Sequence, residues 1–154
     1  MNDFETLYRE LRSDLDALAS PLLDFARQQL QKRGSFLPFS ASLNSRGEVA
    51  LQGASPGKDV ASSAEILPIL HEGLRTIAVQ GDVSAVAVCE WVKITPEGEP
   101  QTDAVKVLVE HARGLAIGFY LPCRKRFLGG WRYGEMLALP VPAEIRAWPT
   151  DGAS

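Results

Sequence analysis

The residues of this chain that most resemble a catalytic pair are Cys123, as a nucleophile, and His111, as its base. A thiol needs a base within hydrogen-bond reach to attack efficiently. Two apolar segments joined by Ala-Arg-Gly predict an antiparallel hairpin in which Cys123 faces Asp103. His111 then lies at the other end of the hairpin, about 26 Å away at roughly 3.3 Å per residue. We therefore predict no catalytic pair, and interpret Cys89 and Cys123 as core residues.

A single carboxylate, Glu90, interrupts an apolar pattern between Val88 and Val92. A buried carboxylate has a raised pKa, which is a property of many general acids and bases. Burying an unpaired charge costs several kcal/mol, so we expect a bulge to turn Glu90 outward or Glu90 to cap a sheet edge. An enzyme that uses Glu90, Glu110 or His111 without a recognisable motif is the third of our functional hypotheses.

The residues able to bind a metal do not occur at the spacings of known sites. His71, His111, Cys89 and Cys123 form no pair at helical or zinc-knuckle spacing. The chain also has no Walker A loop, dinucleotide fingerprint, EF-hand loop or nucleophile elbow. We predict no metal site, no cofactor and no catalytic residue, and favour a non-enzymatic function.

The densest cationic segment also contains three aromatic residues. Arginine and aromatic side chains are enriched at protein interfaces, although they also bind phosphates and stack on bases. A polar loop between strands can carry such charges for solvation alone. Because the net charge of the chain is −3, we expect an acidic protein partner and no nucleic acid. The predicted binding residues are Arg124, Lys125, Arg126, Phe127, Trp131, Arg132 and Tyr133.

Length and composition are those of one ordinary globular domain. The chain has 154 residues, of which 45% are hydrophobic and 23% charged. It begins MNDFETLYRE, with acidic residues where a signal peptide has basic ones. No apolar run approaches the roughly 20 residues that span a bilayer, and two cysteines do not make a disulfide framework. We expect a soluble, cytoplasmic protein that makes no membrane contact.

Three parts are predicted along the chain. Residues 1–34 form an amphipathic helical arm that kinks or restarts at Pro21, residues 35–139 form a sheet with a second helix, and residues 140–154 form an extended, proline-rich tail with mobile last residues. In the middle part, a hairpin precedes a loop at 53–63. The second helix follows from Ser62 to near Gly81.

Three consecutive apolar runs at 83–95, 102–111 and 115–123 predict antiparallel strands, followed by a last strand at 131–139. Tight turns would pair residues whose numbers add to about 197 in the first hairpin and about 226 in the second. The predicted apolar face comprises Val86, Val88, Val92, Ile94, Val105, Val107, Val109, Leu115, Ile117, Phe119, Leu121 and Cys123. The opposite face carries small residues, and we expect the helical arm to cover it, with a partner or homodimer surface as the alternative.

The predicted fold class is α+β, with an antiparallel sheet of five or six strands in the order helix, two strands, helix, three strands, and one further strand at the end. This order resembles the roadblock, longin and profilin-like architecture. The stretches FLPFSASLNSRGEVAL, TDAVKVLVEHARG and LPCRKRFLGGWRYGE resemble a group of small bacterial proteins without an assigned activity. That resemblance implies no catalytic residues, and it favours an adaptor or immunity role. We predict a non-enzymatic protein–protein interaction module; the alternative is a small-ligand-binding or regulatory domain with a pocket between sheet and helix.

Overall fold

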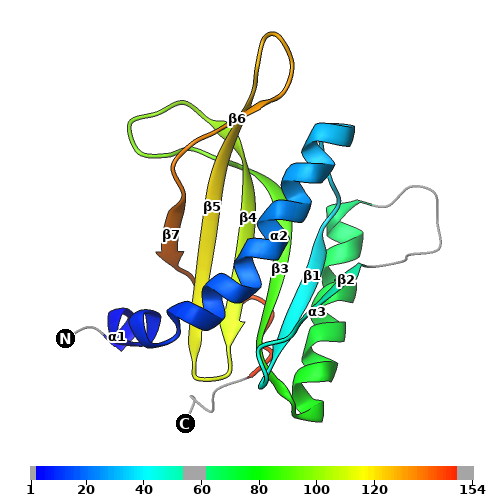
Figure 1. The fold of residues 1–154 in the computed structure, drawn as a ribbon, viewed down its shortest axis with the longest axis vertical. Helices are drawn as coiled ribbons and strands as arrows, with labels where there is room; N and C mark the ends of the chain where they lie inside the picture. Colours follow the sequence, from blue (N-terminus) through cyan, green and yellow to red (C-terminus); the bar gives the residue numbers. More distant parts are fainter. Residues whose placement is uncertain (1–2, 54–61, 149–154) are drawn as a thin grey trace.

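The structure, a computed structural model, describes residues 3–53 and 62–148. Within these residues the fold is α+β, with three helices and one antiparallel sheet of seven strands, which confirms the predicted class (Figure 1). Most of the predicted loop at 53–63 and the end of the predicted tail lie outside the described residues. The elements are α1 (Asp3–Glu10), α2 (Arg12–Arg33), β1 (Phe39–Asn44), β2 (Val49–Gly53), α3 (Ser63–Gln80), β3 (Val83–Ile94), β4 (Thr102–His111), β5 (Leu115–Lys125), β6 (Trp131–Tyr133) and β7 (Leu137–Pro140).

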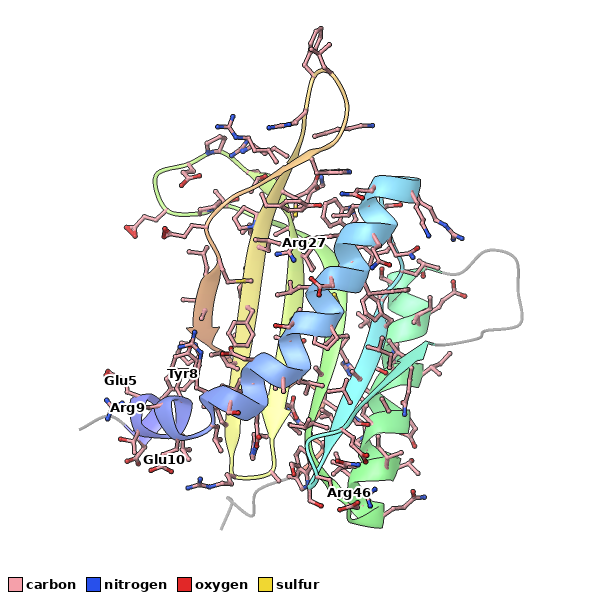
Figure 2. All side chains as sticks on the ribbon, in the orientation of Figure 1. Glu5, Tyr8, Arg9, Glu10, Arg27 and Arg46 are labelled. Carbon is pink, nitrogen blue, oxygen red and sulfur yellow. The ribbon has the colours of Figure 1, made fainter. Side chains whose placement is uncertain are left out.

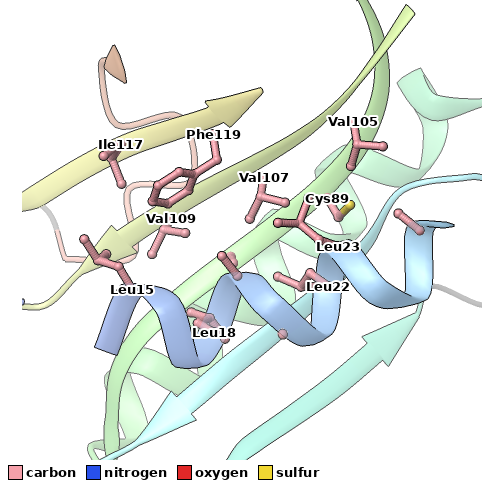
Figure 3. Close-up of a cluster of buried hydrophobic side chains, with 14 of the residues drawn as sticks. Leu15, Leu18, Leu22, Leu23, Cys89, Val105, Val107, Val109, Ile117 and Phe119 are labelled. Carbon is pink, nitrogen blue, oxygen red and sulfur yellow. The ribbon is translucent and has the colours of Figure 1, made fainter. Parts of the chain in front are cut away.

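The sheet separates two hydrophobic cores. Its strand order is β2-β1-β3-β4-β5-β6, and β7 also pairs with β5. Helix α2 crosses one face, where its buried leucines pack on Val107, Phe119 and neighbouring side chains (Figures 1 and 3). Helix α3 packs on the other face, against Val86, Val88 and Leu108. Because successive side chains of a strand point to opposite faces, β3 contributes alternate residues to both cores.

The first helical region breaks at Leu11, ten residues before the predicted position. Helix α2 continues through Pro21, so the predicted restart there is wrong. Proline removes the hydrogen bond to the carbonyl four residues earlier; here that residue is Ala17, which lies on the exposed side of the helix. The helix ends as predicted at Gly34, whose φ of 79° allows its N–H to reach the carbonyl of Leu30.

Helix α3 begins with the capping box predicted from the sequence. The Ser62 hydroxyl accepts the backbone N–H of Glu65 at 3.2 Å, and the Glu65 carboxylate accepts the backbone N–H of Ser62 at 3.0 Å. Each contact satisfies a donor that a helix N-terminus leaves free. The helix stops at Gly81, also as predicted.

The register of β3 on β4 differs from the prediction by one residue, while that of β4 on β5 agrees with it. Glu90 pairs with Lys106 and not with Val107, whereas Asp103 pairs with Cys123 as expected. The observed pairs are centred on Gly98, which has a φ of 75° and lies within a turn closed by the Glu99 N–H on the carbonyl of Pro96 at 3.0 Å. A one-residue shift exchanges the two faces of a strand.

This shift corrects the predicted faces of the sheet. Val86 and Val88 belong to the core beneath α3, while Ala85, Ala87 and Cys89 pack with Val107 beneath α2. The helical arm therefore does cover small residues of β3, as predicted. The small residues of β4 and β5 that were expected to join them, among them Ala104 and Gly118, alternate onto the other face.

The predicted last strand is divided into β6 and β7 because of a proline in its partner. Gly134 donates its N–H to the carbonyl of Pro122 at 2.8 Å, but Pro122 has no N–H to donate in return. The ladder stops there and resumes with β7 beside Ile117–Tyr120. The sheet therefore has seven strands, where five or six were expected.

The described part of the predicted tail is tightly bound to the domain. The carboxylate of Glu110 accepts the backbone N–H groups of Ile145 at 2.6 Å, Arg146 at 2.8 Å and Ala147 at 3.2 Å. Arg75 donates to the carbonyl of Ile145 at 2.8 Å. Ile145 is fully buried in the core beneath α3. Residues 141–148 thus close one side of that core.

Candidate functional site

The segment that joins β5 to β6 is a hairpin that projects beyond the end of the sheet (Figure 1). Its loop is closed by two backbone hydrogen bonds, from Arg126 N–H to the carbonyl of Gly130 at 3.0 Å and from Gly129 N–H to the carbonyl of Arg126 at 3.3 Å. Gly129 and Gly130 both have positive φ, 96° and 79°. Side chains other than glycine rarely adopt this conformation, so the Gly-Gly pair is what allows so tight a return.

Two large apolar side chains stand at the end of this loop. Phe127 is 99% exposed and Leu128 is 91% exposed. Burying a side chain of this size stabilises a protein or a complex by roughly 1.5 to 3 kcal/mol. In the free protein neither side chain is buried, so this stabilisation becomes available only when a partner covers them. Leu128 was not among the predicted binding residues; its position beside Phe127 and before two glycines is the signal that could have identified it.

The four predicted cations surround these apolar side chains. Arg124, Lys125, Arg126 and Arg132 are all exposed, and none forms an ion pair with an acidic side chain of residues 3–53 or 62–148. They line a hollow of about 550 Å³ together with Phe127, Leu128 and Gly129. The hairpin therefore presents a concave cationic surface with an apolar tip.

The other two predicted binding residues support the hairpin from below. The indole N–H of Trp131 donates to the carbonyl of Leu30 at 3.0 Å, and its ring meets Trp91 edge-on at 5.7 Å between centroids. Trp131 is half-buried, and it packs against the core beneath α2. It joins the base of the hairpin to the end of α2, and so lies behind the exposed surface.

Tyr133 has a comparable position beneath the hairpin. The guanidinium of Arg27, which Figure 2 labels on α2, lies 5.4 Å from the centre of the Tyr133 ring. The Tyr133 hydroxyl is buried and has no hydrogen-bond partner within the described residues. Burial raises the pKa of Tyr133, as does the neighbouring Cys123. Trp131 and Tyr133 are therefore not part of the exposed surface. That surface consists of the four predicted cations, Phe127 and the additional residue Leu128.

The sequence candidates for nucleophilic catalysis lie far apart and are enclosed. Cys123 pairs with Asp103 at one end of the β4–β5 ladder, and His111 pairs with Leu115 at the other. Both cysteines are free and buried. Burial raises the pKa of the Cys123 thiol to about 11. The described residues also contain no cluster of side chains able to hold a metal ion.

His111 is held by two hydrogen bonds at the edge of the core. Its Nε2 lies 2.9 Å from an Asp14 carboxylate oxygen, and its Nδ1 accepts the backbone N–H of Arg113 at 3.1 Å. An acceptor at Nδ1 requires the proton of a neutral ring to be at Nε2, which then donates to Asp14. Both nitrogens are occupied, so His111 connects α2 to the sheet and has no nitrogen free for a substrate.

Glu90 is not turned out by a bulge, because the register of β3 on β4 is continuous through it. It lies at an edge, as one of the two expectations had it: the pairing of β1 with β3 ends at Cys89, so within the described residues β3 is paired only with β4 from Glu90 onward. It pairs in register with Lys106, whose Nζ lies 3.8 Å from Glu90 Oε1 and 3.0 Å from Glu144 Oε2. Burial raises the pKa of Glu90, and the Lys106 charge acts in the opposite direction. The carboxylate that looked unpaired in the sequence therefore belongs to a three-residue ionic cluster across β3, β4 and the C-terminal segment.

Comparisons with known proteins give no relative from which a role could be transferred. No protein-family model matches the chain, and no curated protein or solved structure matches it significantly. None of the helices within the described residues is long and apolar enough to cross a membrane.

Proposed function

We propose that this chain is a non-enzymatic protein–protein interaction module, of the adaptor or immunity kind, that binds an acidic protein through the hairpin 124–133. The observation that carries the proposal is the almost complete exposure of Phe127 and Leu128 among four cations that have no acidic partner in the described structure. Apolar anchors with a charged rim are the usual organisation of a protein interface. Two free, buried cysteines suit a reducing cytoplasm.

Anchor and charges have separate roles in this proposal. Rim charges accelerate association with a partner of opposite charge, whereas a desolvated apolar anchor slows dissociation. Trp131 was one of the binding residues expected from the sequence, but its hydrogen bond to Leu30 favours a supporting role, and we assign the anchor to Phe127 and Leu128. Association of two copies through this surface is disfavoured because both hairpins carry the same charge.

The alternative functions have less support. The space between the sheet and α3 holds Ile66, Leu70, Leu74 and Ile145, so a small ligand there would have to displace core side chains. An enzyme using Glu110 would first have to release three backbone hydrogen bonds that hold the C-terminal segment.

The test is capture of partners from the native host, followed by kinetics with the purified partner. Three variants are compared with the wild type: Phe127→Ser with Leu128→Ser, the triple change of Arg124, Lys125 and Arg126 to Gln, and Val79→Ser as a matched control. Val79 is 82% exposed on α3 and lies outside the hairpin. We expect the tip variant to raise the off-rate by at least about tenfold. The charge variant should lower the on-rate and its salt dependence, while the control binds normally.

Two outcomes would contradict the proposal. Normal partner binding by folded tip and charge variants would exclude the hairpin as the contact surface. Binding of the wild type, but not the tip variant, to phosphatidylserine vesicles, with no protein captured, would identify a membrane surface as the partner. Exposed apolar residues flanked by cations also suit an anionic bilayer, so the vesicle measurement is an essential part of the test.

A further inference from the structure

Two arginines stand directly opposite each other at the base of the hairpin. Arg124 of β5 pairs with Arg132 of β6 in the antiparallel register. Side chains at opposed positions share one face and approach closely, and like charges there are destabilising. Alternation along the strands places this pair on the face opposite Cys123 and Tyr133, away from α2. The fold therefore holds two positive charges together on its exposed side.

The acidic residues nearby do not neutralise this pair. Glu99 lines a hollow of about 220 Å³ with both arginines, yet forms no ion pair with either in the described structure. Asp103 lines a neighbouring hollow of about 360 Å³ with Arg124, but its carboxylate is bound to Lys93 at 2.9 Å. The repulsion between Arg124 and Arg132 is thus left without a fixed counter-charge.

Both arginines also line the larger hollow beneath the apolar tip. Arg124 borders all three hollows, and Arg132 borders two of them. Planar guanidinium groups present forked N–H donors that match the paired oxygens of a carboxylate or phosphoryl group. A group held between the arginines would have Phe127 and Leu128 along the same hollow.

We propose that Arg124 and Arg132 form a binding site for one oxyanion, a carboxylate or a phosphoryl group carried next to an apolar moiety. The biological occupant rests on the proposed function, in which the partner protein supplies this group. An anion seated between the arginines replaces their mutual repulsion by two attractive contacts. Lys125 and Arg126 contribute to the positive field of the surface but are not part of the pair.

The site is tested on the full chain with inorganic phosphate as the probe. Arginine side-chain Nε–H resonances are followed by NMR during titration against sodium chloride of matched ionic strength. We expect the signals of Arg124 and Arg132 to shift together and saturate with a Kd on the order of 1 mM. Arg124→Gln should weaken the response of Arg132 by at least about tenfold. Arg126→Gln, the matched control, should change it by less than about twofold.

Shifts that grow without saturation, or an Arg132 response that survives Arg124→Gln in a folded protein, would overturn the proposed site. A parallel titration with acetate distinguishes the two sources of the oxyanion. Saturable binding of acetate as well as phosphate supports a carboxylate partner, while binding of phosphate alone supports a phosphoryl group. Failure of this experiment leaves the tip variants as an independent test of the proposed function, and normal partner binding by the tip variants would not remove an observed anion site.

Discussion

The indole N–H of Trp131 donates to the carbonyl of Leu30, so the base of the hairpin and the last turn of α2 form one unit. Leu30 also accepts the N–H of Gly34 in the helix cap. The position of the exposed surface therefore depends on where α2 ends.

Replacing Trp131 by Phe should destabilise the fold but spare binding by the hairpin. The variant loses the hydrogen bond to Leu30 and part of the contact with Trp91, at a cost of roughly 1 to 3 kcal/mol. Denaturant unfolding measures the loss, and phosphate titration of the folded variant measures the anion site. A variant as stable as the wild type, with anion binding abolished, would place Trp131 in the contact surface.

The two cores predict which pairs of substitutions are coupled. Phe119→Ala should cost about 3 to 5 kcal/mol through the cavity it leaves. Phe119 pairs with Val107 on the α2 face, whereas Val88 faces α3. In double-mutant cycles measured by denaturant unfolding, Val107→Ala should be coupled to Phe119→Ala by at least about 0.5 kcal/mol, and Val88→Ala should be additive with it. Coupling of Val88 as well as Val107 to Phe119 would support the register expected from the turns.

Removing the charge of Glu110 should release the C-terminal segment. Glu110→Gln leaves one carbonyl oxygen to accept three N–H donors, and charge-assisted hydrogen bonds to a buried carboxylate are worth about 1.5 to 3 kcal/mol each. We expect lower stability in denaturant and faster hydrogen exchange at the amides of Ile145 and Ala147. Exposed Glu135, changed to Gln, serves as the control. Unchanged exchange in the Glu110 variant would mean that Ile145 alone holds the segment.

The buried thiols should make the fold sensitive to alkaline pH. Burial raises the pKa of Cys123 from 9.0 to about 11, so the folded state keeps the thiol protonated where the unfolded chain ionises. This contribution to stability is complete below pH 9.0 and is lost progressively as the pH rises towards about 11. Denaturant melts at several pH values should show a smaller alkaline loss for Cys123→Ala. A difference between wild type and variant that does not change with pH would contradict this account.

Thiol labelling gives a second check on the same burial. In the native protein both Cys89 and Cys123 should react slowly with a thiol reagent, and quickly after unfolding. Rapid stoichiometric labelling of native Cys123 would show that the thiol is accessible to solvent. Cys123 would then again be a possible nucleophile.

Local signals in the sequence were sufficient for several elements. The capping box of Ser62 and Glu65, the helix stop at Gly34 and the pairing of Cys123 with Asp103 each depend on residues close together in the chain. The α+β class followed from the change of apolar period from helical to alternating spacing. The basic aromatic segment was also visible, because its residues are adjacent in sequence.

What the sequence could not determine depended on contacts between distant segments. Pairing across the longer β3–β4 connection decided that Glu90 meets Lys106, and that Val88 and Phe119 lie in different cores. Contact of β6 with the end of α2 decided that Trp131 and Tyr133 face inward, which left Phe127 and Leu128 as the exposed apolar pair. Short turns and helix caps are determined by hydrogen bonds between residues that are neighbours in the sequence, so they can be predicted without knowledge of the tertiary structure. The packing of whole helices and strands determines the register of a strand and the side of a hairpin that is exposed to solvent. Both depend on which arrangement buries the most apolar surface.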